Sequence, residues 1–131
     1  MGAGGAEGPP AVKDQDAAHP IAGAWRPMLR AVVRSLVDGD YSLRKGVAGV
    51  EPVSLATAEH MRAYLVDYGA TLVELPGETW KTSVAQWMGT RWDILVDLWT
   101  AEEGRSDLVL EGWVEETDAG PRLTIHMVYV P

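Results

Sequence analysis

Carboxylates and tryptophans are the side chains of this sequence whose types and spacing suggest chemistry. They gather between Trp92 and Trp113, in the stretch WDILVDLWTAEEGRSDLVLEGW. Paired carboxylates can act as an acid and a base, or bind a divalent cation. Tryptophans exposed among carboxylates are typical of surfaces that recognise cationic partners, because cations pack on indole faces. The stretch therefore suggests either a catalytic site or a binding surface.

The other residues that a catalytic or metal site needs are scarce. The chain has no cysteine, and its three histidines, His19, His60 and His126, show neither HxH nor HExxH spacing. No GxSxG pattern surrounds a serine. His126 could meet a carboxylate of a neighbouring strand, such as Glu111, but the sequence does not fix the strand register. We predict no catalytic residue, no metal site and no cofactor, and we favour a protein without enzymatic activity.

Two helices are predicted ahead of the acidic stretch. From Gly23 to Asp38 the apolar residues recur at spacings of three and four, which indicates an amphipathic helix. A second apolar stripe follows Ser54, which suits an N-cap, and ends at Gly69, which suits the position after a helix. The polar side of the first helix carries three arginines, Arg26, Arg30 and Arg34.

After residue 70 the apolar period changes from 3.6 to 2, which indicates strands. We predict a short strand in TLVELP, a second from about Trp80 to Met88, and a third from Arg91 to Thr100. After the AEEG loop a fourth strand leads to the turn TDAGPR, and LTIHMVYV is the last strand. The predicted fold class is α+β, with two N-terminal helices packed on one face of a four- to five-stranded antiparallel meander.

The alternation separates two faces of the predicted hairpin. Residues of one parity would form the core, namely Ile94, Val96, Leu98, Leu108 and Leu110. Two helices can cover only one face of the sheet, so the other parity is left for solvent or for a partner. We predict a partner-binding surface made of Asp93, Asp97, Trp99, Glu103, Arg105, Asp107, Glu111 and Trp113.

The same residues also fit a purely structural interpretation. The acids would then form a solvated face, with repulsion between facing carboxylates relieved by Arg91, Arg105 and Arg122. In that case Trp99 and Trp113 would be shielded by the N-terminal tail, the AEEG loop or a second copy. The core would take Trp25, Trp80 and Trp87.

Length and charge bound the class of protein. The 131 residues suit one domain, and we predict a disordered Gly/Ala/Pro-rich tail over residues 1–21 followed by a single α+β domain over residues 22–131. The net charge of −8 disfavours nucleic acid and anionic membranes as partners. Because the sequence shows no signal peptide and no apolar run long enough to span a bilayer, we expect a cytoplasmic protein.

Two segments, LVELPGETW and VDLWTAEEGRSDLVLE, resemble the core of an uncharacterised family of small bacterial domains. In that family a strand ending in DLWT is followed by a loop and EGRSDL, and the loop residues from Glu103 to Asp107 are the most specific part of the likeness. The similarity spans roughly residues 25–131. It implies a single α+β domain with a tail, and it assigns no activity and no catalytic residue.

Three functional hypotheses follow. The first is a non-enzymatic domain that presents the acidic, tryptophan-bearing sheet face to a basic protein, an immunity-type inhibitor of a cationic toxin being its sharpest version. The second is a small-molecule binder or hydrolase with a pocket between helices and sheet, using Asp97, Asp107, Glu111 or His126. The third is a homodimer formed through the open sheet face, so that a monomer and a homodimer both remain open.

Overall fold

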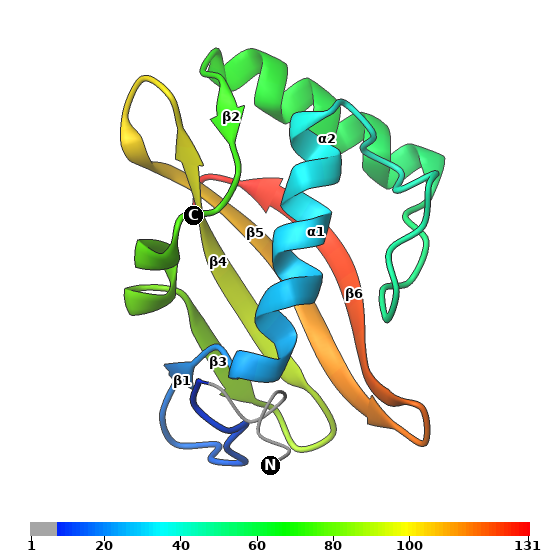
Figure 1. The fold of residues 1–131 in the computed structure, drawn as a ribbon, viewed down its shortest axis with the longest axis vertical. Coiled ribbons are helices and arrows are strands. Elements are labelled where there is room, and N and C mark those ends of the chain that lie inside the picture. The colour runs from blue at the N-terminus through cyan, green and yellow to red at the C-terminus, as the bar shows by residue number, and fades with distance from the viewer. Residues whose placement is uncertain (1–7) are drawn as a thin grey trace.

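The computed structural model describes residues 8–131, which form an α+β fold (Figure 1). The helices are α1 (Arg26–Val37) and α2 (Leu55–Tyr68), and two 3-10 helices are η2 (Gly23–Trp25) and η3 (Gly77–Lys81). The strands are β1 (His19–Pro20), β2 (Leu72–Val73), β3 (Val84–Trp87), β4 (Trp92–Thr100), β5 (Gly104–Thr117) and β6 (Gly120–Tyr129). They form one antiparallel sheet in the order β1-β3-β4-β5-β6, with β2 paired to β4.

Both predicted helices form, and capping residues explain the bounds of α2. Ser54 Oγ accepts a hydrogen bond from the Thr57 amide at 3.1 Å, which begins α2, and Gly69 ends it with a φ of 81°. Pro27 lies in the first turn of α1, where its missing N–H costs nothing. The signals for α2 are therefore correct, whereas the first helix, predicted from Gly23, is a 3-10 helix as far as Trp25 and an α-helix only from Arg26.

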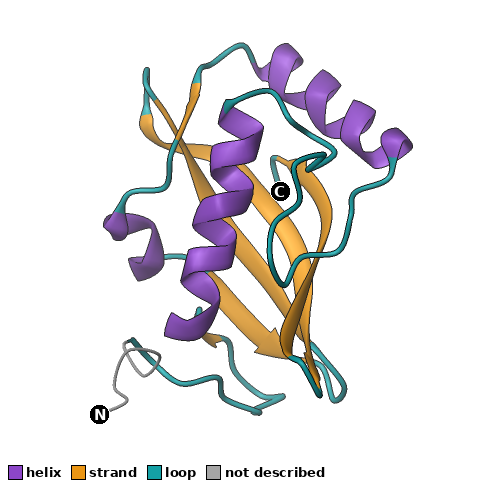
Figure 2. Ribbon diagram, turned by 45° about the vertical axis from the view of Figure 1, so that its right-hand side comes forward, coloured by secondary structure: helices purple, strands orange, loops and turns teal. Residues whose placement is uncertain are grey.

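The helices lie on the same side of the sheet but differ in placement (Figures 1 and 2). α1 crosses the middle of the sheet and buries Leu29, Val32, Val33 and Leu36. α2 lies at the end of the sheet nearest the last residues of β6, and it buries only Ala58, Met61 and Leu65. The prediction of two helices packed on one face therefore holds in outline, with α1 supplying most of the cover.

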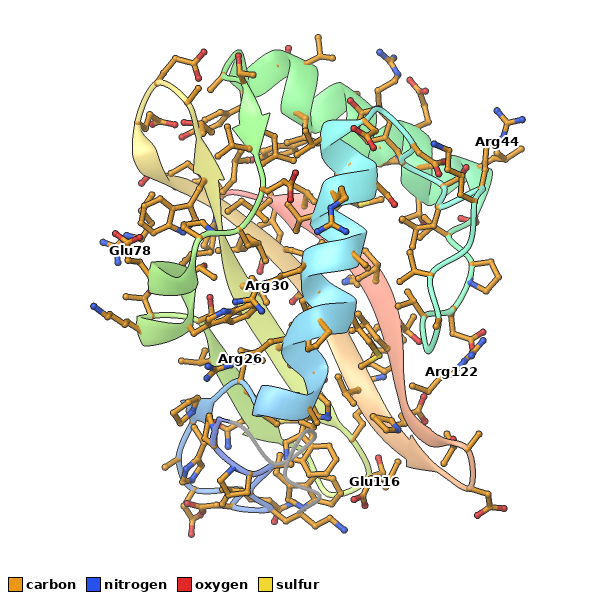
Figure 3. All side chains as sticks on the ribbon, in the orientation of Figure 1. Arg26, Arg30, Arg44, Glu78, Glu116 and Arg122 are labelled. Atoms are coloured by element: carbon orange, nitrogen blue, oxygen red, sulfur yellow. The ribbon has the colours of Figure 1, made fainter. Side chains whose placement is uncertain are left out.

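The sheet has six strands rather than the four or five predicted, because the segment predicted as a tail supplies the two-residue strand β1. The strand expected from about Trp80 is shorter than predicted and begins at Val84, since Gly77–Lys81 form the 3-10 helix η3. Figure 3 shows Arg26 and Arg30 on the side of α1 towards η3, where their guanidinium carbons lie 5.1 and 5.4 Å from the Trp80 ring centroid.

Over residues 8–21 the N-terminal segment is ordered, which departs from the prediction of a disordered tail over residues 1–21. The Trp92 Nε1 atom donates a hydrogen bond to the Val12 carbonyl at 2.9 Å, and the Gln86 side chain donates one to the Gln15 carbonyl at 2.9 Å. His19 and Pro20 then pair with β3 as the edge strand β1. These contacts use backbone carbonyls, which a composition rich in Gly, Ala and Pro does not reveal. Residues 1–7 lie outside the described part of the chain.

The core lies between α1 and the sheet, and the predicted parity is correct. Every residue assigned to the inner face is buried, namely Ile94, Val96, Leu98, Leu108 and Leu110. Trp25, Trp80 and Trp92 are also buried, whereas Trp87 is half-buried at the edge of the core. Of the three tryptophans predicted for the core, Trp25 and Trp80 are therefore confirmed, and Trp92 belongs to the core as well.

The η3 segment replaces a missing strand beside β4. β3 pairs with β4 from Trp92 to Leu95, and β2 pairs with it at Trp99 and Thr100, which leaves the backbone of Asp97 without a strand partner on that side. Thr79 Oγ1 donates to the Asp97 carbonyl at 2.7 Å, and the Asp97 amide donates to Ser83 Oγ at 3.0 Å. Thr79 and Ser83 are themselves buried, and their hydroxyls satisfy backbone groups that have no strand partner on this side.

Thr79→Val is expected to lower the free energy of unfolding by about 1 to 2 kcal/mol, because the Asp97 carbonyl would lose its buried donor while the side-chain volume stays nearly constant. Urea unfolding followed by circular dichroism measures this difference. Thr90→Val, in the exposed turn before β4, is the matched control and should leave the unfolding midpoint unchanged. A Thr79→Val variant as stable as the control would show that the hydroxyl does not support the strand.

Candidate functional site

The sheet face opposite α1 is the candidate site, because both helices and the segment that joins them lie on the other side (Figure 2). Along β4 the burial alternates strictly, with Asp93, Leu95, Asp97 and Trp99 half-buried on the outer face. On β5 the same face carries Val109, Glu111 and Trp113, which the register places opposite those residues. The predicted separation of the hairpin into an apolar face and an acidic, aromatic face is therefore present.

The register keeps the carboxylates of β4 and β5 apart. Asp93 lies directly opposite Trp113, Glu111 opposite Leu95, and Asp97 opposite Val109. Like charges that face each other across a sheet are destabilising, and this register avoids such pairs. The result is a surface in which apolar side chains alternate with carboxylates.

Trp113 is flanked by two basic side chains. The Arg91 guanidinium carbon lies 4.1 Å from the Trp113 ring centroid, and Arg91 Nε donates a hydrogen bond to Asp93 Oδ1 at 3.1 Å. The His126 ring lies further away, with its centroid 6.0 Å from that of Trp113. Trp113 is half-buried by these neighbours, and it remains at the surface.

Glu111 and His126 form a pair. The sequence suggested this contact, but it did not fix the strand register that brings the two side chains together. His126 Nδ1 lies 2.8 Å from Glu111 Oε1, and the two side chains are 60% and 35% exposed. A register shift after Glu111 makes His126 the extra residue of β6, since Glu111 pairs with Met127 and Gly112 with Ile125. Burial, followed by the charge and hydrogen bonding of Glu111, raises the pKa of the nearby Tyr129 phenol.

Near the loop after β4, two of the predicted site residues, Glu103 and Asp107, form hydrogen bonds with α2. Tyr68 of α2 donates its hydroxyl to both Glu103 carboxylate oxygens at 2.9 Å, and it accepts the Asp107 amide at 3.3 Å. This environment raises the pKa of Tyr68, because burial and Glu103 outweigh the lowering effect of the Asp107 amide. Glu103 therefore anchors the loop to α2 and lies apart from the surface around Trp113.

Trp99, Arg105 and Asp107 complete the predicted set, and they occupy different environments. Trp99 is half-buried beside Gly104, packs against the core cluster, and has a buried Nε1 atom without a hydrogen-bond partner among the described residues. Arg105 pairs with Trp99 in the register and is exposed, as is Asp107. The structural interpretation, in which the loop shields a tryptophan, thus describes Trp99 better than Trp113.

The alternative site between helices and sheet is not assembled by its proposed residues. Asp97 and Glu111 lie on the face opposite the helices, and His126 contacts Glu111 there. A hollow of about 320 Å³ does lie between the ends of α1 and α2, with Leu36, Val37, Tyr41, Leu65 and Val66 in its wall, and none of the proposed residues lines it.

Residues 8–131 contain neither the ligand cluster of a metal site nor a helix that could span a membrane. In this part of the chain no cluster of three or more His, Asp or Glu side chains is arranged to hold a metal ion. Neither α1 nor α2 is long and apolar enough to cross a membrane.

These features define a small α+β protein with helices on one face of an antiparallel sheet and a mixed acidic and aromatic surface on the other. The chain belongs to a family described as a domain of unknown function, DUF7668, whose model matches residues 33–131. This result confirms the resemblance to an uncharacterised family. The match begins within α1, so β1 and η2 precede it. No curated protein and no solved structure matches the chain.

Proposed function

We propose that this protein is a non-enzymatic binding domain that docks a basic partner protein on the sheet face opposite α1. The observation that carries the proposal is the surface around Leu95 and Trp113, where half-exposed apolar side chains are bordered by Asp93, Asp97 and Glu111. Partly exposed aromatic side chains commonly anchor protein interfaces, and surrounding charges select the partner.

The charge of the surface supports a basic partner. Five carboxylates lie on the outer side of β4 and β5: Asp93, Asp97, Asp107, Glu111 and Glu115. Among the described residues only Asp93 has an arginine or lysine within ion-pair distance. In a chain of net charge −8, this surface would attract a cationic protein and accelerate the encounter. An inhibitor of a cationic toxin is the sharpest form of the proposal.

Site-specific photo-crosslinking tests which face of the protein binds the partner. A photoreactive amino acid replaces Thr124, which lies opposite Trp113 on β6, or Val66, which is 64% exposed on α2. After exposure to lysate of the source organism, we expect position 124 to yield one basic protein that position 66 does not. That protein is then purified, and its dissociation constant is measured by calorimetry at two salt concentrations.

Reversing the charge of carboxylates on the sheet face, and separately on the helix side, gives a matched comparison of the two faces. Asp107→Lys with Glu115→Lys is expected to weaken binding of the identified protein at least about tenfold, mainly through slower association. Asp38→Lys with Asp67→Lys makes the same charge change on the helix side and should have little effect. Equal losses in both pairs, crosslinks from position 66 alone, or crosslinks only to a second copy of this chain would contradict the proposal.

A further inference from the structure

The contact between Arg91 and Trp113 has the chemistry of a guanidinium-binding site. Arg91 stacks on the indole with its guanidinium carbon 4.1 Å from the ring centroid, and Asp93 accepts a hydrogen bond from its Nε atom at 3.1 Å. Asp93 and Trp113 are direct neighbours across β4 and β5, so the sheet itself fixes the distance between the carboxylate and the aromatic face. A planar cation that can stack and donate at the same time fits this pair better than a compact ammonium.

The occupant of this site is held loosely. The Arg91 and Asp93 side chains are 39% and 43% exposed, and exposed ion pairs are readily exchanged with solvent or with another ion. The Arg91 carbonyl accepts the Met88 amide at 2.7 Å, so the backbone of the turn is fixed independently of the side chain. The guanidinium can therefore leave Trp113 while the hairpin stays intact.

We infer that the basic partner presents an arginine that takes the place of Arg91 on Trp113 and Asp93, and that Arg91 acts as a tethered internal competitor. This inference rests on the proposed function and names the chemistry of its contact. The exchange conserves both the stacking and the hydrogen bond, so the partner's remaining contacts with the acidic face determine the affinity. While no partner is bound, Arg91 also covers part of the half-buried Trp113 indole.

The test uses N-acetyl-arginine amide as the probe and the Trp113 indole N–H as the reporter. In nitrogen-15-labelled full-length protein, the Trp113 signal is identified by its loss in Trp113→Phe. Removal of the competitor by Arg91→Ala is expected to strengthen binding of the probe about tenfold, the gain that follows if Arg91 occupies the site in about nine of ten molecules. Arg91→Gln, which keeps the side-chain length, should give a gain of the same sign even if Arg91→Ala perturbs the turn.

Three controls define the result. Arg44→Ala removes an exposed arginine from the segment between the helices, on the other side of the sheet, with the same change in net charge, and it should bind the probe like the unmodified chain. Adding Asp93→Asn to Arg91→Ala should abolish the gain, and N-acetyl-lysine amide should bind more weakly than the arginine probe. Equal gains in Arg91→Ala and Arg44→Ala, no preference for arginine, or an unchanged Trp113 signal would each overturn the inference.

The two proposals fail separately. If position 124 crosslinks the partner but Trp113 does not bind the arginine probe, the proposed binding face is supported and the inferred arginine contact is overturned. Selective binding of the arginine probe with crosslinks from position 66 alone would place the partner elsewhere and leave Trp113 as a small-ligand site.

Discussion

Trp92→Ala is expected to lower the free energy of unfolding by about 3 to 5 kcal/mol, a large part of the stability of a domain of this size. Trp92 is 2% exposed and packs edge-on against Trp25, with ring centroids 5.0 Å apart. Its ring centroid also lies 4.5 Å from that of Trp87, and its Nε1 atom bonds the Val12 carbonyl. One side chain therefore joins the helical layer, the sheet and the N-terminal segment.

Urea unfolding and limited proteolysis measure this effect together. Trp92→Phe keeps an aromatic ring but removes the bond to Val12, so it should cost less than alanine while still exposing residues 8–20 to protease. Trp113→Ala, which truncates a tryptophan on the outer face, is the comparison and should cost markedly less than Trp92→Ala. If both alanine variants unfold at the same urea concentration, the assignment of Trp92 to the core is wrong.

Gly112→Ala is expected to lower the free energy of unfolding by about 3 kcal/mol, because the added methyl group has no room. A Cβ atom at Gly112 would lie 2.3 Å from the Thr124 carbonyl oxygen and 3.4 Å from the Ile125 Cα atom, all of it backbone of β6. Backbone cannot rotate away as a side chain can. The two strands must separate at the register shift that places His126 beside Glu111.

Thermal unfolding reports the loss, and the His126 ring signals report the local change. Gly77→Ala is the control, since a Cβ atom there meets no other atom within 4 Å. We expect Gly77→Ala to unfold like the unmodified protein. An unchanged His126 spectrum in a destabilised Gly112→Ala variant would mean that the strands tolerate the methyl group without moving at the bulge.

Local signals in the sequence were sufficient for the helices and for the two faces of the hairpin. Ser54 and Gly69 mark α2 because capping depends on a few adjacent residues, and the alternation from Trp92 to Thr100 fixes which side chains share a face. The remaining features depend on contacts between distant residues. The bond from Trp92 to Val12 spans 80 positions, and the shift at Gly112 depends on how closely β6 approaches.

The candidate site also combines features that follow from the local sequence with features that depend on contacts between distant residues. Parity alone places Asp93, Asp97, Glu111 and Trp113 on one face, whereas the environment of Glu103 depends on Tyr68, 35 positions away. The stacking of Arg91 on Trp113 could be foreseen only in part, because Arg91 precedes Asp93 by two residues but its aromatic partner comes from the next strand. The contact that suggests the chemistry of a partner thus arises from the strand register.

The hydroxyl groups of Thr79 and Ser83 also bear on how the protein avoids aggregation. An exposed row of amides and carbonyls along a strand is a template for another strand, from a second copy or from a misfolded chain. At Asp97 such a strand would meet a 3-10 helix and a backbone whose donor and acceptor are already bonded. Short β2 and β3 on either side leave little length for pairing. This margin of the sheet is therefore protected against the strand addition through which β proteins polymerise.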